Sequence, residues 1–250
     1  MKISIITACR NSASTVRRTM ESVLAQKGVD VEHLVIDGAS TDGTAEVVRA
    51  YARPGLTVVS EPDNGLYDAL NKGIRLATGD VIGILNADDV FEDETTLARV
   101  AAAFDDATDA VSADIRFVKD GRTTRYYSGR GWRPWMARWG FMVPHPGVYL
   151  RRELFARFGG YRTDYRISAD FELMLRYFCV HGVRRKYLPG PVVQMSPGGL
   201  STSGLKAMLL LNRENVRANR ENGRFSCLPM MLPKYLYKIL GVIWTKGTKK

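Results

Sequence analysis

The stretch Val81-Ile82-Gly83-Ile84-Leu85-Asn86-Ala87-Asp88-Asp89 decides the fold class. Its apolar run follows Gly79-Asp80 and ends in acids, which is typical of a buried central strand in a parallel sheet. In open α/β sheets, ligands bind beyond the carboxyl ends of such strands. Two carboxylates and an amide at that position suit a hard divalent cation such as Mg or Mn. The alternative is that Asp88 or Asp89 caps a helix expected at Glu92–Phe104.

The composition is that of a soluble globular protein with anionic partners. The 250 residues are 45% apolar and 25% charged, and the formal net charge is +10. Nucleotide phosphates, nucleic acid or an acidic membrane surface would each complement this charge. The sequence contains no basic helix with base-reading side chains and no aromatic RNA-binding motif, so we expect no nucleic acid partner.

The cysteines and the apolar segments indicate the cellular compartment in which the protein is expected. Cys9, Cys179 and Cys227 are far apart and lack zinc-site spacing, which favours a reducing cytoplasm. No uncharged apolar run is long enough to span a bilayer, and the N-terminus leads directly into a strand. We therefore expect no signal peptide and no spanning helix.

Strands alternate with helices in the first half of the chain. Strands are expected at Ile3–Ala8, Val31–Ile36 and Leu56–Ser60, before the central strand. Helices are expected between them, with apolar residues at helical spacing from Val16, from Ala45 to Ala52, and from Leu66 to Gly79. This alternation predicts a mostly parallel, right-handed wound sheet flanked by helices, a Rossmann-like α/β fold.

The pattern changes after about residue 105. Ala110–Val118 and Thr123–Tyr127 are expected to pair antiparallel around Asp120-Gly121. The remaining expectations are little regular structure at Gly129–Gly140, a strand at Gly147–Leu150, helices at Arg151–Phe158 and Ala169–His181, and a helical segment from Leu205 interrupted by Pro229 and Pro233. We divide the chain into a catalytic domain at 1–204, with halves 1–105 and 106–204, and a helical basic tail at 205–250.

The first strand-to-helix turn contains Thr7, Arg10 and Asn11. It carries neither a GxGxxG nor a GxxxxGK[ST] motif, which argues against a hydride-transfer dinucleotide site and a P-loop. A nucleotide can still lie across these strand ends, with Asp37 accepting a hydrogen bond from its base or ribose. For Asp42, turn or cap duty is the better interpretation.

Several motifs in order resemble those of glycosyltransferase family 2, in particular the branch that builds bacterial exopolysaccharide and lipopolysaccharide. The resemblance covers about residues 2–200. The motifs are Ser4–Asn11, Val35–Thr44, Ser60–Ile74, Leu85–Asp89, Pro144–Phe155, Phe158–Tyr161 and Ile167–Arg176.

The resemblance implies a GT-A fold, a nucleoside-diphosphate sugar donor, a divalent cation and inversion at the anomeric carbon. Asp37 matches the acid that contacts the nucleoside. Asn86-Ala87-Asp88 occupies the place of the Asp-x-Asp metal motif, with Asp89 immediately after. Because Asn86 replaces the first acid, the metal would rely on Asp88 or Asp89, while the amide could hydrogen-bond ribose.

Asp170 matches the catalytic acid of the family's Glu-Asp pair, although its neighbour here is Ala169. An inverting transfer needs a base that takes the proton of the acceptor hydroxyl, and Asp170 is the candidate. The alternative is that Ser168 or Asp170 caps the helix that follows.

Other residues receive roles from their places in the motifs. Asp68, Asn71 and Lys72 are expected to face the donor phosphates, although Asp68 could equally be an exposed helix residue. His145 lies in a loop that the family places near the acceptor. It has either a structural role or a contact with the metal or the substrate. His33 and His181 are interpreted as structural or surface residues.

The C-terminal tail combines apolar and basic residues at helical spacing. Tyr235, Ile239 and Ile243 fall on one side and are flanked by Lys238 and Lys246. Such a segment can lie in an anionic membrane interface, or it can dock on the protein itself.

Together these observations predict an inverting glycosyltransferase with a UDP-linked donor. The acceptor would be a glycan or lipid-linked hydroxyl in cell-surface polysaccharide synthesis, on the cytoplasmic side of the inner membrane. A sugar-nucleotide nucleotidyltransferase and a non-catalytic membrane-associated scaffold are the alternatives. A nucleotidyltransferase would carry a Gly-rich basic loop after the first strand, and this chain has Ala8-Cys9-Arg10-Asn11 there.

Overall fold

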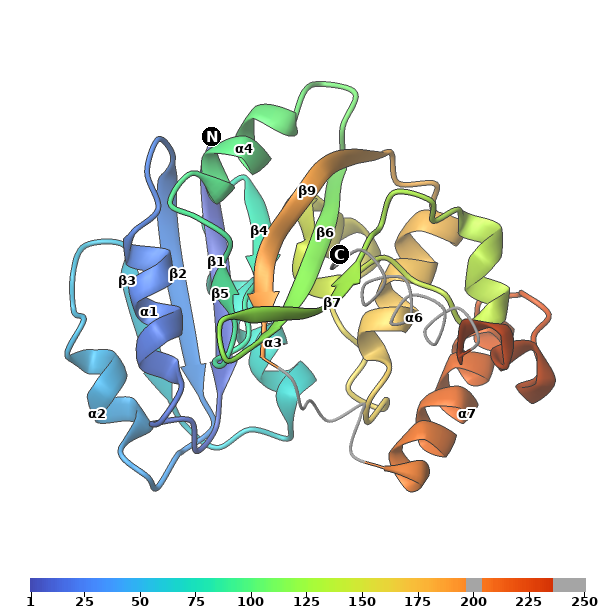
Figure 1. Ribbon diagram of the computed structural model, residues 1–250, viewed down its shortest axis with the longest axis horizontal. Coiled ribbons are helices and arrows are strands. Elements are labelled where there is room, and N and C mark those ends of the chain that lie inside the picture. Colours follow the sequence, from blue (N-terminus) through green and yellow to red (C-terminus); the bar gives the residue numbers. More distant parts are fainter. Residues whose placement is uncertain (197–203, 236–250) are drawn as a thin grey trace.

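The computed structural model describes residues 1–196 and 204–235 (Figure 1). The strands are β1 (Lys2–Cys9), β2 (Asp30–Asp37), β3 (Leu56–Ser60), β4 (Val81–Ile84), β5 (Val90–Phe91), β6 (Ala110–Lys119), β7 (Arg122–Tyr127), β8 (Val148–Arg151) and β9 (Arg185–Met195). The α-helices are α1 (Val16–Leu24), α2 (Thr44–Arg49), α3 (Leu66–Leu76), α4 (Thr96–Ala103), α5 (Glu153–Phe158), α6 (Ala169–Leu175) and α7 (Leu205–Glu221). Shorter helical turns are η1 (Pro134–Trp139), η2 (His145–Gly147), the π-helical η3 (Arg176–Val180) and η5 (Leu228–Met231).

Within the described residues, the strands form one nine-stranded sheet in the order β3-β2-β1-β4-β8-β6-β9-β5, with β7 paired to β6. β1 pairs in parallel with β2 and with β4, and β2 pairs in parallel with β3. The register sets Cys9 opposite Asp37, and Asp37 opposite Ser60. The carboxyl ends of these strands therefore meet at one edge, as the alternating pattern predicts.

The second half extends the same sheet with antiparallel strands. β8 pairs antiparallel with β4 and β6, and β6 forms the expected hairpin with β7. Asp120 and Gly121 form the hairpin turn with positive φ angles of 51° and 71°, a conformation that Asp and Gly tolerate better than most residues. The predicted change of pattern after residue 105 is thus confirmed.

Two elements differ from the sequence expectations. β9 was not predicted; it pairs in parallel with β6 and antiparallel with the two-residue β5. The helix expected from Glu92 begins only at Thr96, because Val90 and Phe91 pair with β9 and Asp93 accepts the backbone N–H of Thr95 at 2.8 Å.

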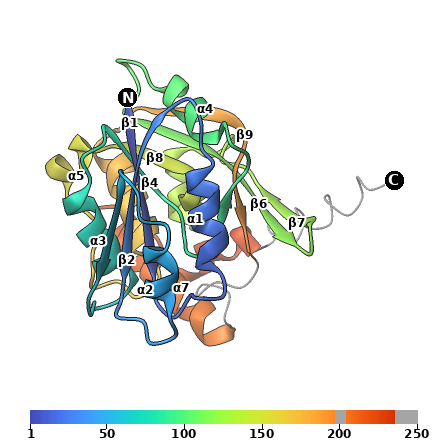
Figure 2. The same cartoon turned by 90° about the vertical axis from the view of Figure 1, so that its left-hand side faces the viewer.

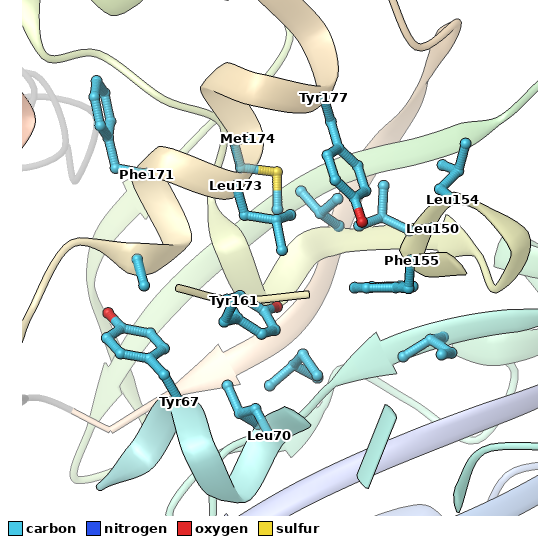
Figure 3. Packing of buried hydrophobic residues seen from close by; sticks show 14 of the residues in the cluster. Tyr67, Leu70, Leu150, Leu154, Phe155, Tyr161, Phe171, Leu173, Met174 and Tyr177 are labelled. Carbon is cyan, nitrogen blue, oxygen red and sulfur yellow. The ribbon is translucent and has the colours of Figure 1, made fainter. Parts of the chain in front are cut away.

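Helices cover both faces of the sheet. Figure 2 shows α3 and α5 on one side and α1 and α4 on the other. One core cluster joins Leu70 of α3 to Phe155 of α5 and to the buried residues of α6 (Figure 3). A second joins Val23 of α1 to Val100 of α4 across the other face. α1 and α3 each bury one mainly apolar face, the pattern from which they were predicted, whereas α6 is buried on nearly all sides.

The described part of the expected tail lies against the body. α7 packs on α6 and on η1, and its Ala218 belongs to the core cluster on the α6 side. Residues 236–250, which carry most of the predicted interfacial segment, lie outside the described residues. In the described part of the chain, no helix combines the length and apolar character needed to cross a bilayer.

A buried histidine makes the stability of this fold depend on pH. His33 is fully buried in β2, and its Nε2 lies 3.0 Å from Thr7 Oγ1. Its Nδ1 has no hydrogen-bond partner among the residues that the structure describes. Burial, together with repulsion from Arg53, lowers the pKa of His33 to about 3. Below the pKa of an unfolded histidine, about 6.5, the unfolded chain binds a proton that the folded chain does not.

We therefore expect the free energy of unfolding to decrease as the pH falls from about 6.5 towards 3. His33 would contribute up to about 1.4 kcal/mol per pH unit in this range. His33→Gln cannot titrate and can still hydrogen-bond Thr7, so its pH slope should be shallower than that of the wild type. Urea unfolding at a series of pH values measures both slopes, and equal slopes would show that His33 is not the group responsible.

Candidate functional site

The strand-end edge collects most of the residues predicted to bind the donor. Arg10 and Asn11 follow β1, Asp37 ends β2, and the 86–89 loop follows β4. Because β1, β2 and β4 are mutually parallel, these residues share one edge of the sheet. Asp63 belongs to the same group, since its carboxylate lies against Gly38 beside the Arg10 side chain.

Asp37 is fully buried and saturated with hydrogen bonds. Its carboxylate accepts from the Ser40 backbone N–H at 3.1 Å, from the Ser40 hydroxyl, and from the Ser60 hydroxyl at 2.6 Å. The Cys9 thiol lies 3.8 Å away, and burial and this carboxylate together raise the pKa of Cys9 to about 12. These bonds hold Asp37 rigidly at the edge, while the thiol beside it stays protonated.

The loop after β2 is tied to the loop after β1. Asn11, with a positive φ of 51°, accepts the Thr41 N–H at 3.0 Å and donates its own N–H to Ser40 Oγ at 2.8 Å. Asp42 accepts from the Ala13 N–H and from the Thr44 N–H, both at 3.0 Å. This confirms turn duty for Asp42. The Arg10 side chain is exposed at the same edge.

Thr7, unlike Arg10 and Asn11, does not lie in the turn that follows β1. Its side chain is fully buried within β1 and its hydroxyl lies 3.0 Å from His33 Nε2. The structure thus places Thr7 inside the sheet rather than at the exposed strand-end edge, and contact with a ligand stays a prediction.

The 86–89 loop separates its two acids. Asp89 is buried, and its carboxylate accepts from Asn86 Nδ2 at 2.8 Å and from the Ser196 N–H at 3.1 Å. Burial, with the adjacent Asp88 charge, raises the pKa of Asp89 to about 7. Asp88 is half-buried, and burial raises its pKa as well. The buried Ala87 packs in the core under the loop.

Asp88 and Asp89 suit a divalent cation whose remaining ligands come from a bound substrate. Across residues 1–196 and 204–235, no group of three or more His, Cys, Asp or Glu side chains could hold a metal ion, so His145 does not join Asp88 and Asp89 in one ligand set. Mg is commonly held by one or two carboxylates together with substrate phosphates. Asp88 is the better candidate ligand, because both oxygens of Asp89 already accept hydrogen bonds.

The three polar residues predicted on α3 have separate partners. Lys72 pairs with Glu61 at 2.8 Å and donates to the Pro62 carbonyl at 2.8 Å. Asp68 accepts the Asn64 N–H at 3.0 Å at the helix start. Asn71 bonds both backbone groups of Tyr161, at 2.7 and 2.9 Å. Lys72 and Asp68 thus order the turn between β3 and α3, and Asn71 ties α3 to the second half of the chain.

Asp170 lies in the first turn of α6 and is half-buried. Its Oδ1 accepts the N–H of Phe171 at 2.7 Å, whereas Ser168, the residue before the helix, makes no side-chain cap. Burial raises the pKa of the Asp170 carboxyl, and the nearby His145 opposes this shift. A carboxylate with a raised pKa is a stronger base than an exposed one.

His145 is held beside Asp170 by an aromatic pair. Its Nε2 lies 2.7 Å from the hydroxyl of the buried Tyr161, whose ring stacks on Tyr67 at 5.8 Å. Tyr67 in turn donates its hydroxyl to the carbonyl of Ile167. Burial lowers the pKa of His145, with Asp170 opposing. His145 is therefore hydrogen-bonded to Tyr161 and interacts electrostatically with the carboxyl group of Asp170.

A pocket of about 320 Å³ opens next to Tyr67, although neither Asp170 nor His145 lines it. It is lined by the start of α3, residues 64–68, and by residues 163–166. Tyr67 belongs to its wall and reaches the residues directly before Asp170. The pocket therefore lies between the start of α3 and the loop that leads into α6.

Some functional candidates were missed from sequence. The motif Phe158–Tyr161 assigns no separate role to Tyr161. No sequence pattern marks Glu214 on α7, although its carboxylate accepts backbone N–H groups from the loop before Asp170. A buried acid on a helix carries no spacing signal of its own.

Known proteins are similar to this chain in sequence and in fold. The family model described as Glycosyl transferase family 2 matches residues 4–188. A PGL/p-HBAD biosynthesis glycosyltransferase of Mycobacterium tuberculosis (strain ATCC 25177 / H37Ra) is 31% identical over 206 residues, which are 80% of this chain and 79% of that protein.

Solved glycosyltransferase structures agree. The mannosyltransferase PcManGT from Pyrobaculum calidifontis, in complex with GDP-Man and Mn2+, has a TM-score of 0.64 and 25% identity, covering 97% of this chain and 71% of that one. S. aureus TarS 1–349 has a TM-score of 0.65 and 18% identity, covering 87% of this chain and 65% of that one, a likeness of fold alone. The predicted GT-A fold is confirmed.

Proposed function

The chain belongs to glycosyltransferase family 2, and from this premise we propose an inverting transfer from a nucleoside-diphosphate sugar to an acceptor hydroxyl. The observation that carries the proposal is Asp170, a half-buried acid of raised pKa that lies near His145 and follows the loop that lines the pocket. The strand-end edge with Asp37 and the 86–89 loop supports binding of the donor.

The donor nucleoside would lie across the ends of β1 and β2. Asp37 would exchange a bond to Ser40 or Ser60 for one from base or ribose. Asn86 would bind ribose, and Arg10 would attract phosphate charge. The sequence favours a uridine nucleotide, while the mannosyltransferase neighbour was solved with GDP-Man. Both nucleotides therefore belong in the binding test.

The acceptor hydroxyl would enter from the pocket between α3 and residues 163–166. Asp170 takes the hydroxyl proton as the oxygen forms its bond to the anomeric carbon. The bond from that carbon to the diphosphate breaks on the opposite face, and the diphosphate leaves with the electron pair. One displacement inverts the configuration and needs no enzyme nucleophile.

A divalent cation, Mn or Mg, would be held by Asp88, with Asp89 directly behind it. When bound, such a cation neutralises the charge that develops on the departing diphosphate. The two desolvated acids of the loop attract a cation because both are less stable as free anions in a buried environment.

The relatives and the exposed surface support a proposal for the acceptor class. The mycobacterial relative carries a biosynthetic name, PGL/p-HBAD biosynthesis, which supports a role in building a cell-surface glycan or a lipid-linked acceptor. We propose that the enzyme works on the cytoplasmic face of a membrane. Exposed Trp135, Phe225 and Leu232, at 61%, 67% and 63%, support contact with an anionic bilayer.

For the membrane proposal, we expect the full chain to sediment with anionic vesicles and not with zwitterionic ones. Added salt should weaken binding, because the basic residues are screened. Removing residues 236–250, or replacing Trp135 and Phe225 with Ser, should each reduce binding at unchanged fold. Equal binding to zwitterionic vesicles, or none to either kind, would contradict the proposal.

For the metal, we expect EDTA to abolish transfer and Mn or Mg to restore it. Asp88→Ala should lower turnover by about 10²-fold or more, because a charge-stabilising contact at the leaving group is lost. It should also remove the Mn-dependent part of the thermal stabilisation by UDP or GDP. Asp106→Ala, an exposed acid far from the strand-end edge, is the control and should behave as wild type. Full turnover in chelator would refute the metal role.

For the base, we expect Asp170→Asn to keep the fold and the affinity for the nucleotide. Its amide oxygen can still accept the Phe171 N–H, but it cannot take a proton. Transfer should fall by about 10²- to 10⁴-fold, the usual contribution of a general base.

The matched control for Asp170→Asn is Asp42→Asn, another acid in a turn, which should transfer at a near-normal rate. A wild-type rate for Asp170→Asn would return Asp170 to a structural role. Wild-type protein that neither transfers sugar nor hydrolyses any donor with Mn would favour the scaffold alternative.

A further inference from the structure

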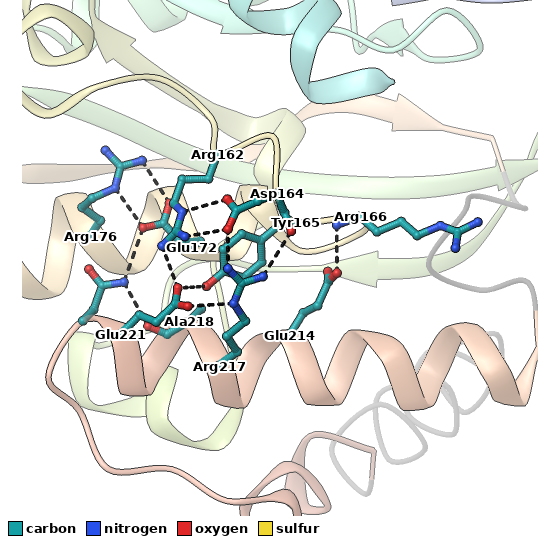
Figure 4. Close-up of polar contacts among 11 residues, drawn as sticks. Arg162, Asp164, Tyr165, Arg166, Glu172, Arg176, Glu214, Arg217, Ala218 and Glu221 are labelled. Carbon is teal, nitrogen blue, oxygen red and sulfur yellow. Dashed lines mark hydrogen bonds and ion pairs between the residues drawn. The ribbon is translucent and has the colours of Figure 1, made fainter. Parts of the chain in front are cut away.

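The helix α7 contacts the loop before Asp170 with one face. Glu214, Arg217 and Glu221 follow one another at intervals of three and four residues, so they lie on the same side of the helix. All three reach into residues 162–168 (Figure 4). Arg217 binds the backbone and side chain of Asp164, and Glu221 accepts from Arg162 at 2.6 Å.

Glu214 differs from Arg217 and Glu221 because, among the described residues, its carboxylate accepts hydrogen bonds only from backbone N–H groups. Its Oε1 accepts the N–H of Arg166 at 2.8 Å, and its Oε2 accepts those of Ile167 and Ser168, both at 2.9 Å. Glu214 is only 7% exposed, and none of the ion pairs found in residues 1–196 and 204–235 involves it. Three consecutive amides therefore solvate a buried carboxylate.

These three amides precede the acid group directly. Ser168 is the residue immediately before α6, and Asp170 stands two residues later in the first turn of that helix. The Ser168 side chain makes no cap to that turn. The position and direction of the first turn consequently depend on the backbone that Glu214 holds.

We infer that Glu214 is a positioning residue for Asp170 and that α7 forms part of the active site. The inference rests on the proposed role of Asp170. It extends the site beyond residues 4–188, the part matched by the family model. Glu214 acts through the backbone of residues 166–168 and not through contact with substrate.

The test compares Glu214→Gln with Glu32→Gln in the full chain. Gln cannot satisfy all three amides, because its NH2 group must face at least one of them. Glu32 is the control: it is also 7% exposed and accepts several hydrogen bonds from Ser4 and Thr78, at the start of β2 away from the strand-end edge. It differs from Glu214 in also pairing with Lys2 at 3.3 Å.

We expect Glu214→Gln to lower kcat by about 10²-fold, since a misplacement of about 1 Å can cost that much. The nucleotide Kd and the donor KM should stay at wild-type values. Backbone N–H groups of residues 166–168 should exchange faster with deuterium than in the wild type. Glu32→Gln should lose stability but keep kcat and the exchange rates of this loop.

Unchanged exchange at residues 166–168 in Glu214→Gln would overturn the inference, whether or not any donor is turned over. An equal loss of kcat in Glu32→Gln would also overturn it, because general destabilisation would then explain the effect. Faster exchange with a wild-type kcat would refute the positioning role as well. If Glu214→Gln does not fold, Glu214→Asp keeps the charge, withdraws the carboxylate by one methylene and takes the same measurements.

A full-rate Asp170→Asn would instead show that the proposed base is wrong. In that case the exchange measurement still decides whether Glu214 orders the loop. The two failures are therefore distinguishable.

Discussion

Parallel pairing of β1 with both β2 and β4 is the constraint on which the rest of the structure depends. Parallel neighbours need crossover connections, so α1 and α3 must lie against the faces of the sheet. The same pairing brings the carboxyl ends of the strands to one edge. Polar loops that are distant in sequence become neighbours there, and the antiparallel half then extends the sheet from β4.

Three acids around the site, Asp37, Asp89 and Glu214, are buried, and each is stabilised mainly by uncharged donors. Hydroxyl and backbone groups hold Asp37, an amide and a backbone N–H hold Asp89, and three backbone N–H groups hold Glu214. A buried carboxylate without such donors would cost several kcal/mol. The bonds order the loops around the site while the negative charge remains available to a cation or a proton.

The elements that could be predicted from the sequence are those that a local residue pattern marks. Leu56–Ser60 was predicted with its observed bounds, because a β-branched run between turns needs no distant partner to be identified. β9 was missed because Pro189, Gly190 and Pro191 interrupt its pattern, and its partners β5 and β6 lie far away in sequence. The strand-end acids were predictable because they directly follow strands. Glu214 was not, since its partner Ile167 is 47 residues away.

The contact between the end of β9 and the 86–89 loop determines when, during synthesis, the nascent chain can complete that loop. Ser196 donates to the Asp88 carbonyl at 2.7 Å and to the Asp89 carboxylate, across 108 and 107 residues of chain. The parallel strands that support the 86–89 loop are complete by residue 84. A nascent chain can thus form its nucleotide-side sheet early, as domains do during translation. The loop that would face the diphosphate cannot be closed until the ribosome has passed residue 196.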